Sequence, residues 1–180
     1  MKKKSKRKRV ISKTTKFLNS GEDTLKISEK NYAQDIKRLA PSSARLHQAQ
    51  RKFWDQKPAT NEGVLDGFTE IAAPDERHSN GLIGQFKHLF RGRANAIDLG
   101  GGNGRVSKGV LLPWFKKVDL VEQSGPLLAG AKKNVPKIRN FIHSGLQDFK
   151  FTRRYDCIWV QWVLCYLDDD ELMEFLRKAV

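Results

Sequence analysis

The segment from Ile97 to Arg105, Ile-Asp-Leu-Gly-Gly-Gly-Asn-Gly-Arg, constrains the fold of this chain more than any other. The apolar run 94–99 predicts a β-strand, and residues 105–116 predict a helix with one apolar stripe. Glycines at 100, 102 and 104 let the backbone turn sharply and approach a ligand, because they carry no Cβ. The helix that follows offers free N–H groups at its start. This order of strand, glycine loop and helix predicts a binding site for a small polar or anionic ligand.

The spacing of the glycines, together with a later acidic residue, indicates which ligand. Gly100, Gly102 and Gly104 follow the pattern G-x-G-x-G, whereas dinucleotide-binding proteins carry G-x-G-x-x-G. The observed pattern is similar to that of methyltransferases. A second apolar strand, 117–121, ends at Glu122, 18 residues after Gly104, where a carboxylate can accept hydrogen bonds from both ribose hydroxyls. The two features predict adenosine recognition, although a glycine loop alone is also compatible with a simple turn.

Strands and helices alternate through the rest of the chain. Residues 126–134 predict a helix, 139–143 a third strand and 155–163 a fourth, and Asp168 or Asp169 can cap a last helix. Such alternation predicts an α/β, Rossmann-like fold with parallel strands and a ligand at their carboxyl ends. The candidate residues that then share one edge of the sheet are Gly100, Glu122, Leu146, Gln147, Gln161 and Trp162.

The length of 180 residues favours one domain with a sizeable core. Three segments are expected: a disordered basic extension at 1–29, a helical lid segment at 30–93, and the Rossmann-like domain at 94–180. A doubly wound methyltransferase sheet usually has more strands than the four found here, and the fourth strand would expose an unpaired edge. We therefore expect a domain that is apparently truncated after the fourth strand and its helix, as in a partial gene product.

The lid segment contains several predicted pieces. Residues 30–40 permit a short helix, and Ser43 can cap a second helix that runs to Trp54. Residues 54–68 interleave aromatic, proline, glycine and apolar residues, which suits a structured lid over a pocket or a loop that packs on its own helices. Residues 74–80 are polar and predict a connection, and residues 81–89 predict a helix that leads into the first strand.

The formal net charge of +14 is concentrated at the start of the chain. Half of it lies between Met1 and Arg9, where seven residues are Lys or Arg. Such a block is typical of a nuclear-import signal or a nucleic-acid arm, and a solvated tail is the alternative interpretation. We therefore expect the nucleus, the cytoplasm or both, with nucleic acid as a possible partner of the tail.

Other composition features exclude several classes of protein. Cys157 and Cys165 lie in one apolar stretch, which argues against a disulfide framework and favours a reducing, intracellular compartment. No run approaches the roughly 18 apolar residues of a membrane helix, so no membrane partner is expected. The four histidines lack the spacing of metal ligands, so we expect no metal.

A methyltransferase of this kind needs little chemistry from the protein, because the methyl group of S-adenosylmethionine (AdoMet) is already activated by the sulfonium charge. The enzyme must orient a nucleophile and exclude water. Arg105 is placed to pair with the methionine carboxylate, and the segment 145–148 is placed to contact adenine. Trp159 is expected in the core and Trp162 in the pocket. The Asn or Asp followed by Pro-Pro and an aromatic, which many nucleic-acid methyltransferases carry after the fourth strand, is absent here.

Several linked motifs together resemble one family over about residues 48–178. They are Phe53-Trp54 with Pro58, Thr60, Gly63, Leu65 and Gly67-Phe68; the Gly100 loop with Arg105; Leu111-Leu112-Pro113; Gly145-Leu146-Gln147-Asp148-Phe149; and Tyr155-Asp156 through Gln161-Trp162. The chain resembles the alpha-N-terminal protein methyltransferases, which have a class I SAM-dependent methyltransferase fold. These enzymes use AdoMet to methylate the free α-amine of proteins that begin X-Pro-Lys. The resemblance implies cofactor contacts at Gly100, Gly102, Arg105, Glu122, Gln123, Gly145, Leu146, Gln147 and Gln161, and peptide contacts at Leu65, Ile71 and Trp162.

The chain departs from that family at the ribose and amine positions. Glu122 stands where the family usually has Asp, and Tyr166 stands where it typically has a histidine near the reacting amine. Tyr166 is the candidate catalytic residue here, although it is neutral at pH 7 and a poorer base, while an α-amine that titrates near pH 8 is already partly neutral. The family's Asn and Asp that hold and deprotonate the amine are expected after Val180. An RNA or rRNA methyltransferase with a basic arm and a catalytically inactive AdoMet-binding fragment are the alternatives.

Overall fold

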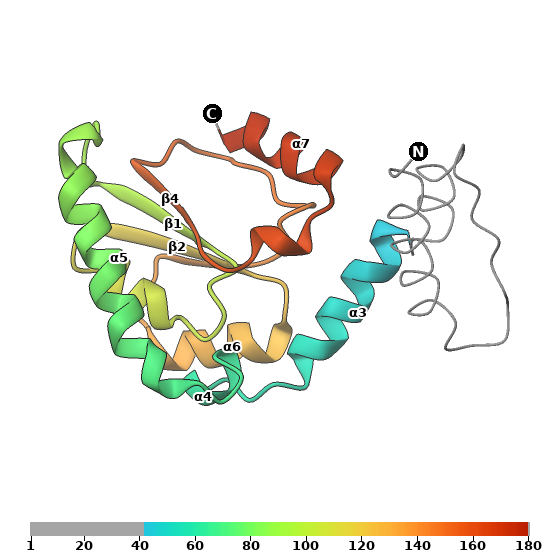
Figure 1. The fold of residues 1–180 in the computed structure, drawn as a ribbon. Helices are drawn as coiled ribbons and strands as arrows, with labels where there is room; N and C mark the ends of the chain where they lie inside the picture. Colours follow the sequence, from blue (N-terminus) through green and yellow to red (C-terminus); the bar gives the residue numbers. More distant parts are fainter. Residues whose placement is uncertain (1–41, 180) are drawn as a thin grey trace, which may run out of the picture. The chain divides into compact units, whose positions relative to one another are not determined.

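The structure, a computed structural model, describes residues 42–179, so the predictions for 1–29 and for the helix at 30–40 lie outside the described residues (Figure 1). Four parallel strands form one sheet in the order β3-β2-β1-β4. The strands are β1 (Asn95–Leu99), β2 (Lys117–Glu122), β3 (Asn140–His143) and β4 (Cys157–Val160). The predicted α/β class with a parallel sheet is confirmed.

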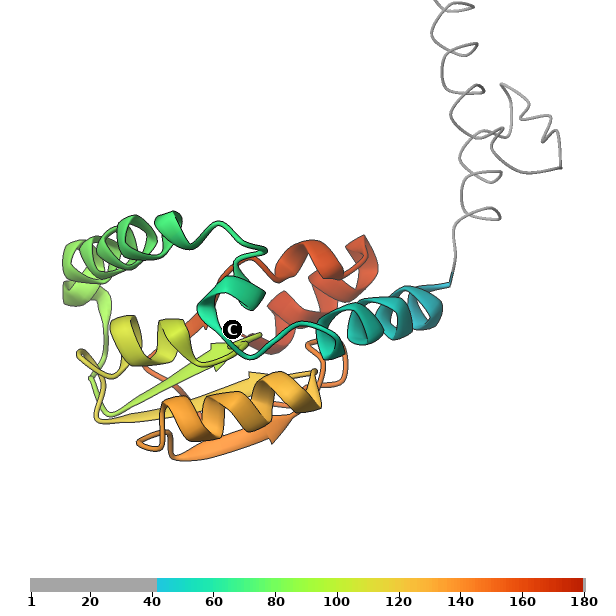
Figure 2. The same ribbon diagram turned by 90° about the horizontal axis from the view of Figure 1, so that it is seen from below.

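Both faces of the sheet are covered by apolar side chains, as expected for parallel strands. On one face Ala96, Val118 and Leu120 pack against α5 (Ala72–Phe86) and α6 (Gly125–Asn134). On the other face Ile97 and Leu99 pack with Phe175 of α7 (Asp169–Ala179). Figure 2 shows α6 on the near side of the sheet and α7 behind it. The alternation of side chains along β1 and β2 therefore builds a three-layer core.

The segment before β1 is more helical than the sequence predicted. It contains α3 (Ser43–Asp55), α4 (Asn61–Val64), a 3₁₀ turn at Thr69–Ile71, α5, and a second 3₁₀ turn at Lys87–Leu89. The predicted connection at 74–80 is wrong, because these residues lie inside α5. Pro74 is tolerated there since it occupies the first turn, where the missing N–H has no partner within the helix.

The capping residues predicted for the last helix and for α3 have different outcomes. Asp168 caps α7: its Oδ1 accepts from the Glu171 N–H at 2.8 Å, and a Glu171 carboxylate oxygen accepts from the Asp168 N–H at 3.1 Å. Ser43 was predicted to cap α3, which is wrong. The N-cap position is Ser42, which makes no side-chain cap bond, and the Ser43 hydroxyl donates to Asp168 instead.

The predicted helix at 105–116 and the predicted strand at 155–163 are both shorter in the structure. The helix begins at Arg105, widens into a π-helical turn at Ser107–Leu111 and gives way to turns before Lys117, because Pro113 has no N–H to continue it. β4 ends at Val160, and Trp162 adopts a left-handed φ of 60° that an extended strand does not allow. None of the described helices is long and apolar enough to cross a membrane.

Candidate functional site

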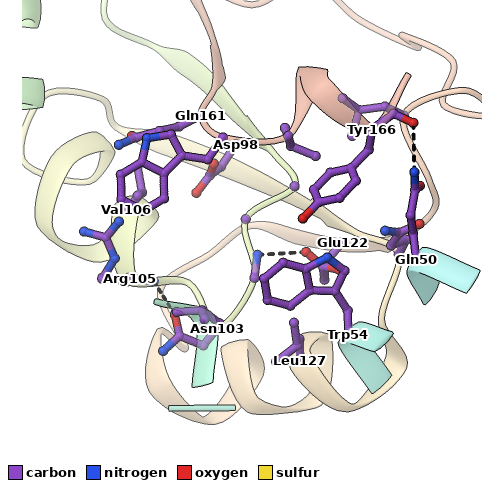
Figure 3. Close-up of a pocket in the computed structure, with 18 of the residues that line it drawn as sticks. Gln50, Trp54, Asp98, Asn103, Arg105, Val106, Glu122, Leu127, Gln161 and Tyr166 are labelled. Carbon is purple, nitrogen blue, oxygen red and sulfur yellow. Dashed lines mark hydrogen bonds between the residues drawn. The ribbon is translucent and has the colours of Figure 1, made fainter. Parts of the chain in front are cut away.

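A cavity of about 360 Å³ lies at the carboxyl end of the sheet, which is within the roughly 300–1,000 Å³ of small-molecule sites (Figure 3). The glycine loop, the end of β2, the segments after β3 and β4, and the lid form its walls. Every predicted site residue lines this one cavity: Gly100, Gly102, Arg105, Glu122, Gln123, Gly145, Leu146, Gln147, Gln161, Leu65, Ile71, Trp162 and Tyr166. The contacts that each makes with a ligand stay predictions.

The glycine loop needs glycine for both its backbone and its surroundings. Gly100 and Gly104 have φ values of 75° and 84°, in the left-handed region that side chains other than glycine rarely adopt. A Cβ at Gly100 would lie 2.8 Å from Val163, and a Cβ at Gly104 would lie 2.7 Å from Val135. The loop therefore packs tightly between the segment after β4 and the end of α6, and it presents its backbone to the cavity.

Glu122, the last residue of β2, lies in the cavity wall. Its side chain is buried, and its two oxygens accept from the Gly102 N–H at 2.9 Å and the Ser124 N–H at 2.8 Å (Figure 3). Burial raises the pKa of this carboxyl, while the backbone N–H groups lower it. Each carboxylate oxygen has a further lone pair, so Glu122 can hold the loop and still accept from two hydroxyl groups.

Asp98 is a second buried carboxylate in the cavity wall, at the end of β1. Its Oδ2 accepts from the Ser107 hydroxyl at 2.6 Å. Burial, with a smaller contribution from the charge of Glu122, raises the pKa of Asp98 to about 6, although the hydrogen bond from Ser107 opposes this shift. The sequence placed Asp98 before the glycine loop but did not identify it as a site residue.

Arg105 is held by a residue that the sequence analysis missed. Its Nη2 donates to Oδ2 of Asp75 at 2.7 Å, and the Trp162 ring centre lies 6.0 Å from the guanidinium carbon. Its Nη1 is buried and has no hydrogen-bond partner among the described residues. An unpaired buried guanidinium N–H is costly, and a carboxylate is the group that matches it. Asp75 was missed because residues 74–80 were predicted to be a connection.

One face of the lid helix α3 packs against the segment that follows β4. Besides the Ser43 contact, His47 Nε2 lies 2.8 Å from a Glu171 carboxylate oxygen, and Gln50 Nε2 donates to the Tyr166 carbonyl at 3.3 Å. Trp54 then meets the Tyr166 ring edge-on, with ring centres 6.4 Å apart. No role was predicted for His47 from the sequence, yet His47 lines the cavity with Gln50 and Trp54.

Tyr166 and Trp162 both line the cavity from the segment that follows β4. Burial raises the pKa of the Tyr166 hydroxyl, which therefore stays protonated at neutral pH. The Trp162 side chain is exposed, as are Phe68 and Ile71 at the same rim. The placement predicted for the two tryptophans is confirmed, since Trp159 packs on the core while Trp162 lines the cavity.

These groups fit AdoMet. The unpartnered Nη1 of Arg105 suits the amino-acid carboxylate, and the free lone pairs of Glu122 suit the ribose. The nearly buried Leu146, with Gln147 beside it, offers an apolar surface and an amide to a flat base. Among the described residues, no cluster of acidic, histidine or cysteine side chains could hold a metal ion.

Comparison with known proteins agrees with this chemistry. Residues 42–180 match the family described as AdoMet dependent proline di-methyltransferase. The chain is 35% identical to N-terminal Xaa-Pro-Lys N-methyltransferase 1 of Xenopus tropicalis over 78% of its length and 67% of that protein. It is 40% identical to alpha N-terminal protein methyltransferase 1 of Dictyostelium discoideum over 72% of its length and 52% of that protein.

A solved structure from Leishmania major extends this similarity to the fold. That protein is a SAM-dependent methyltransferase, and it matches 81% of this chain and 63% of its own with a TM-score of 0.72 and 25% identity. The chain thus spans about half to two thirds of the curated relatives that it matches. A parallel sheet, a glycine loop before an acidic strand end, and the match of residues 42–180 all agree. The chain belongs to the AdoMet dependent proline di-methyltransferase family.

Proposed function

We propose that this chain transfers methyl groups from AdoMet to the free α-amine of proteins that begin X-Pro-Lys. The relatives named for this activity support the proposal. The observation that carries it is the cavity itself, in which groups suited to AdoMet lie beside an open aromatic rim. A peptide terminus can enter by this rim, whereas the buried polar groups deeper inside suit the cofactor.

The cofactor side is assigned to residues that are held before any ligand arrives. Arg105 would hold the amino-acid carboxylate, Glu122 the ribose, and the segment 145–147 the adenine. AdoMet supplies a methyl group that its sulfonium charge has already activated. Because Arg105 and Glu122 are both fixed by neighbouring groups, the protein spends little ordering entropy when it binds.

The acceptor side is assigned to the rim. Trp162, Phe68 and Ile71 offer exposed apolar surface to an extended peptide and its proline ring. The Tyr166 hydroxyl can accept a hydrogen bond from the α-amine, whose neutral form is substantially populated near its pKa of about 8. In this arrangement the protein orients the amine and excludes water, and it needs no strong base.

The test is the mass of a Ser-Pro-Lys peptide after incubation with the chain and AdoMet. We expect added methyl groups on the free peptide and none on the same peptide acetylated at its N-terminus. The Trp162→Ala variant should transfer fewer methyl groups than the unchanged chain. Its affinity for S-adenosylhomocysteine should be at least as high as that of the unchanged chain. Absence of added mass in a chain that binds S-adenosylhomocysteine would refute the proposed transfer to this acceptor.

We also propose that the chain works in the nucleus, the cytoplasm or both. The support is the basic block between Lys2 and Arg9, whose composition is that of an import signal. A fluorescent fusion should lose its nuclear accumulation when this block is removed. If distribution is unchanged and the block instead confers RNA binding that weakens steeply with salt, the block is a nucleic-acid arm.

A further inference from the structure

A chain of polar contacts connects α5 to two strand ends at the cavity. Asp75, in the first turn of α5, uses both carboxylate oxygens: Oδ2 accepts from Arg105 Nη2 at 2.7 Å, and Oδ1 accepts from Gln161 Nε2 at 2.6 Å. Gln161 Oε1 in turn accepts from the indole N–H of Trp159 at 2.8 Å. Arg105 follows the glycine loop after β1, and Gln161 follows β4, so one carboxylate joins two neighbouring loops.

The chemistry of the partners fixes the orientation of each group. An indole N–H can only donate and a carboxylate can only accept, so the Gln161 amide must point its oxygen to Trp159 and its nitrogen to Asp75. The guanidinium is likewise fixed, because Nη2 is committed to Asp75. Arg105 and Gln161 project on the same side of the pocket in Figure 3, where both line the cavity.

This arrangement leaves one part of the guanidinium available. The side chains of Arg105 and Asp75 are only 10% and 15% exposed, so water competes little with their ion pair. Arg105 Nη1 is buried and has no partner among the described residues. A long arginine side chain has many rotamers, and ordering it at the moment of binding reduces affinity. A carboxylate that already holds Nη2 removes that cost and leaves Nη1 to the ligand.

We propose that Asp75 is a positioning residue, which orients Arg105 toward the amino-acid carboxylate of the cofactor and aligns Gln161 beside it. Asp75 does not contact the reacting atoms and acts through the guanidinium. Its effect is therefore confined to ligands that carry the carboxylate. The inference rests only on the cofactor half of the proposed function, since it requires no methyl acceptor.

The experiment compares two ligands by calorimetry with the full 180-residue chain. S-adenosylhomocysteine and 5′-methylthioadenosine share the adenosine and the thioether, and only the first carries the amino-acid carboxylate. For Asp75→Asn we expect S-adenosylhomocysteine to bind about 10-fold or more weakly, because a charge-assisted hydrogen bond is lost, with 5′-methylthioadenosine unchanged. Glu174→Gln is the matched control, since it neutralises an exposed acid of α7, and it should change neither dissociation constant.

A double-mutant cycle then separates positioning from a direct role. Arg105→Gln should show the same ligand selectivity, and adding Asp75→Asn to it should weaken S-adenosylhomocysteine no further. Equal weakening or loss of both ligands by Asp75→Asn would overturn the proposal, because it would show a structural role of α5. Unchanged or tighter S-adenosylhomocysteine binding would also overturn it, because Asp75 would then be dispensable or would compete for Arg105. Peptide methylation enters none of these outcomes, so a failed transfer assay would leave them interpretable.

Discussion

Replacing Asp98 with Asn should make the protein more stable at neutral pH. Asp98 is only 2% exposed and has one strong hydrogen bond, from the Ser107 hydroxyl at 2.6 Å. Burial disfavours its charged form and raises its pKa from 3.8 to about 6. The folded protein therefore keeps a charge at pH 7 that its surroundings stabilise poorly. Asparagine has no charge to bury, and its side-chain oxygen can still accept from Ser107.

The pH dependence has a definite sign. Between 3.8 and about 6 the folded state binds more protons at Asp98 than the unfolded state, so stability falls as the pH rises through this window. The penalty is complete above the folded pKa. At about 1.4 kcal/mol for each pH unit that separates the two pKa values, it amounts to roughly 3 kcal/mol. Asp98→Asn should therefore gain up to about 3 kcal/mol at pH 7.5 and nothing below pH 4.

Urea unfolding at a series of pH values measures this difference. The variant must be compared with the unchanged protein at each pH, because other carboxyl groups, such as Asp119, titrate in both. Ser107→Ala is a control that should act in the opposite direction. It removes a hydrogen bond that lowers the pKa of Asp98, so the folded-state pKa should rise further and the free energy of unfolding at pH 7.5 should fall. Parallel stability curves for Asp98→Asn and the unchanged protein would refute the reasoning.

Other substitutions address the ribose contact, the support of the sheet and the tyrosine. Glu122→Gln removes the charge that the ribose hydroxyls would meet, so S-adenosylhomocysteine should bind about 100-fold more weakly in calorimetry; a change below about threefold would reject this contact. Asp119→Asn breaks an ion pair between the buried Asp119 and the partly exposed Arg139, which donates from Nε at 2.8 Å and Nη2 at 2.7 Å, and it should cost about 2–3 kcal/mol in urea unfolding. Burial raises the pKa of Asp119, but the hydrogen bonds that Asp119 accepts outweigh burial and lower the pKa. The stabilisation by Asp119 is therefore present above pH 3.8 and is lost as the pH falls further. A variant that loses stability with falling pH as steeply as the unchanged protein would contradict this reasoning. Tyr166→Phe should leave the shape of the pH–rate profile between pH 7 and 9 unchanged, because the hydroxyl stays protonated; loss of an ionisation from the profile would show that Tyr166 acts as a base.

The parts of the fold that the sequence predicted well are those specified by local signals. The strand at 94–99, the glycine loop and the second strand each depend on a few adjacent residues. The left-handed φ of Gly100 is marked in the sequence by the glycine itself, and the end of β2 is marked by the acidic residue Glu122. The alternation of strands and helices was then enough to predict a parallel sheet, because few topologies are compatible with this order of elements.

The missed residues depend on contacts between distant segments. Asp75 bonds to residues 30 and 86 positions later, and nothing near it in the sequence marks those partners. Pro74 and its polar neighbours favoured a connection, since local composition does not reveal that Pro74 falls in a first helical turn. The docking face of α3 shows the same limit, because Ser43, His47 and Gln50 find partners 116 to 125 residues away.

One asparagine connects the lid to the glycine loop. Asn103, within the glycine loop, accepts from the Arg105 N–H at 3.2 Å and donates to Asn61 of α4 at 3.0 Å. Beside it, a Cβ at Gly102 would lie 3.4 Å from Val64 of the same lid helix. The glycine loop therefore also supports the wall that carries Leu65. Because the glycine loop and α4 share these contacts, the two walls of the cavity support each other.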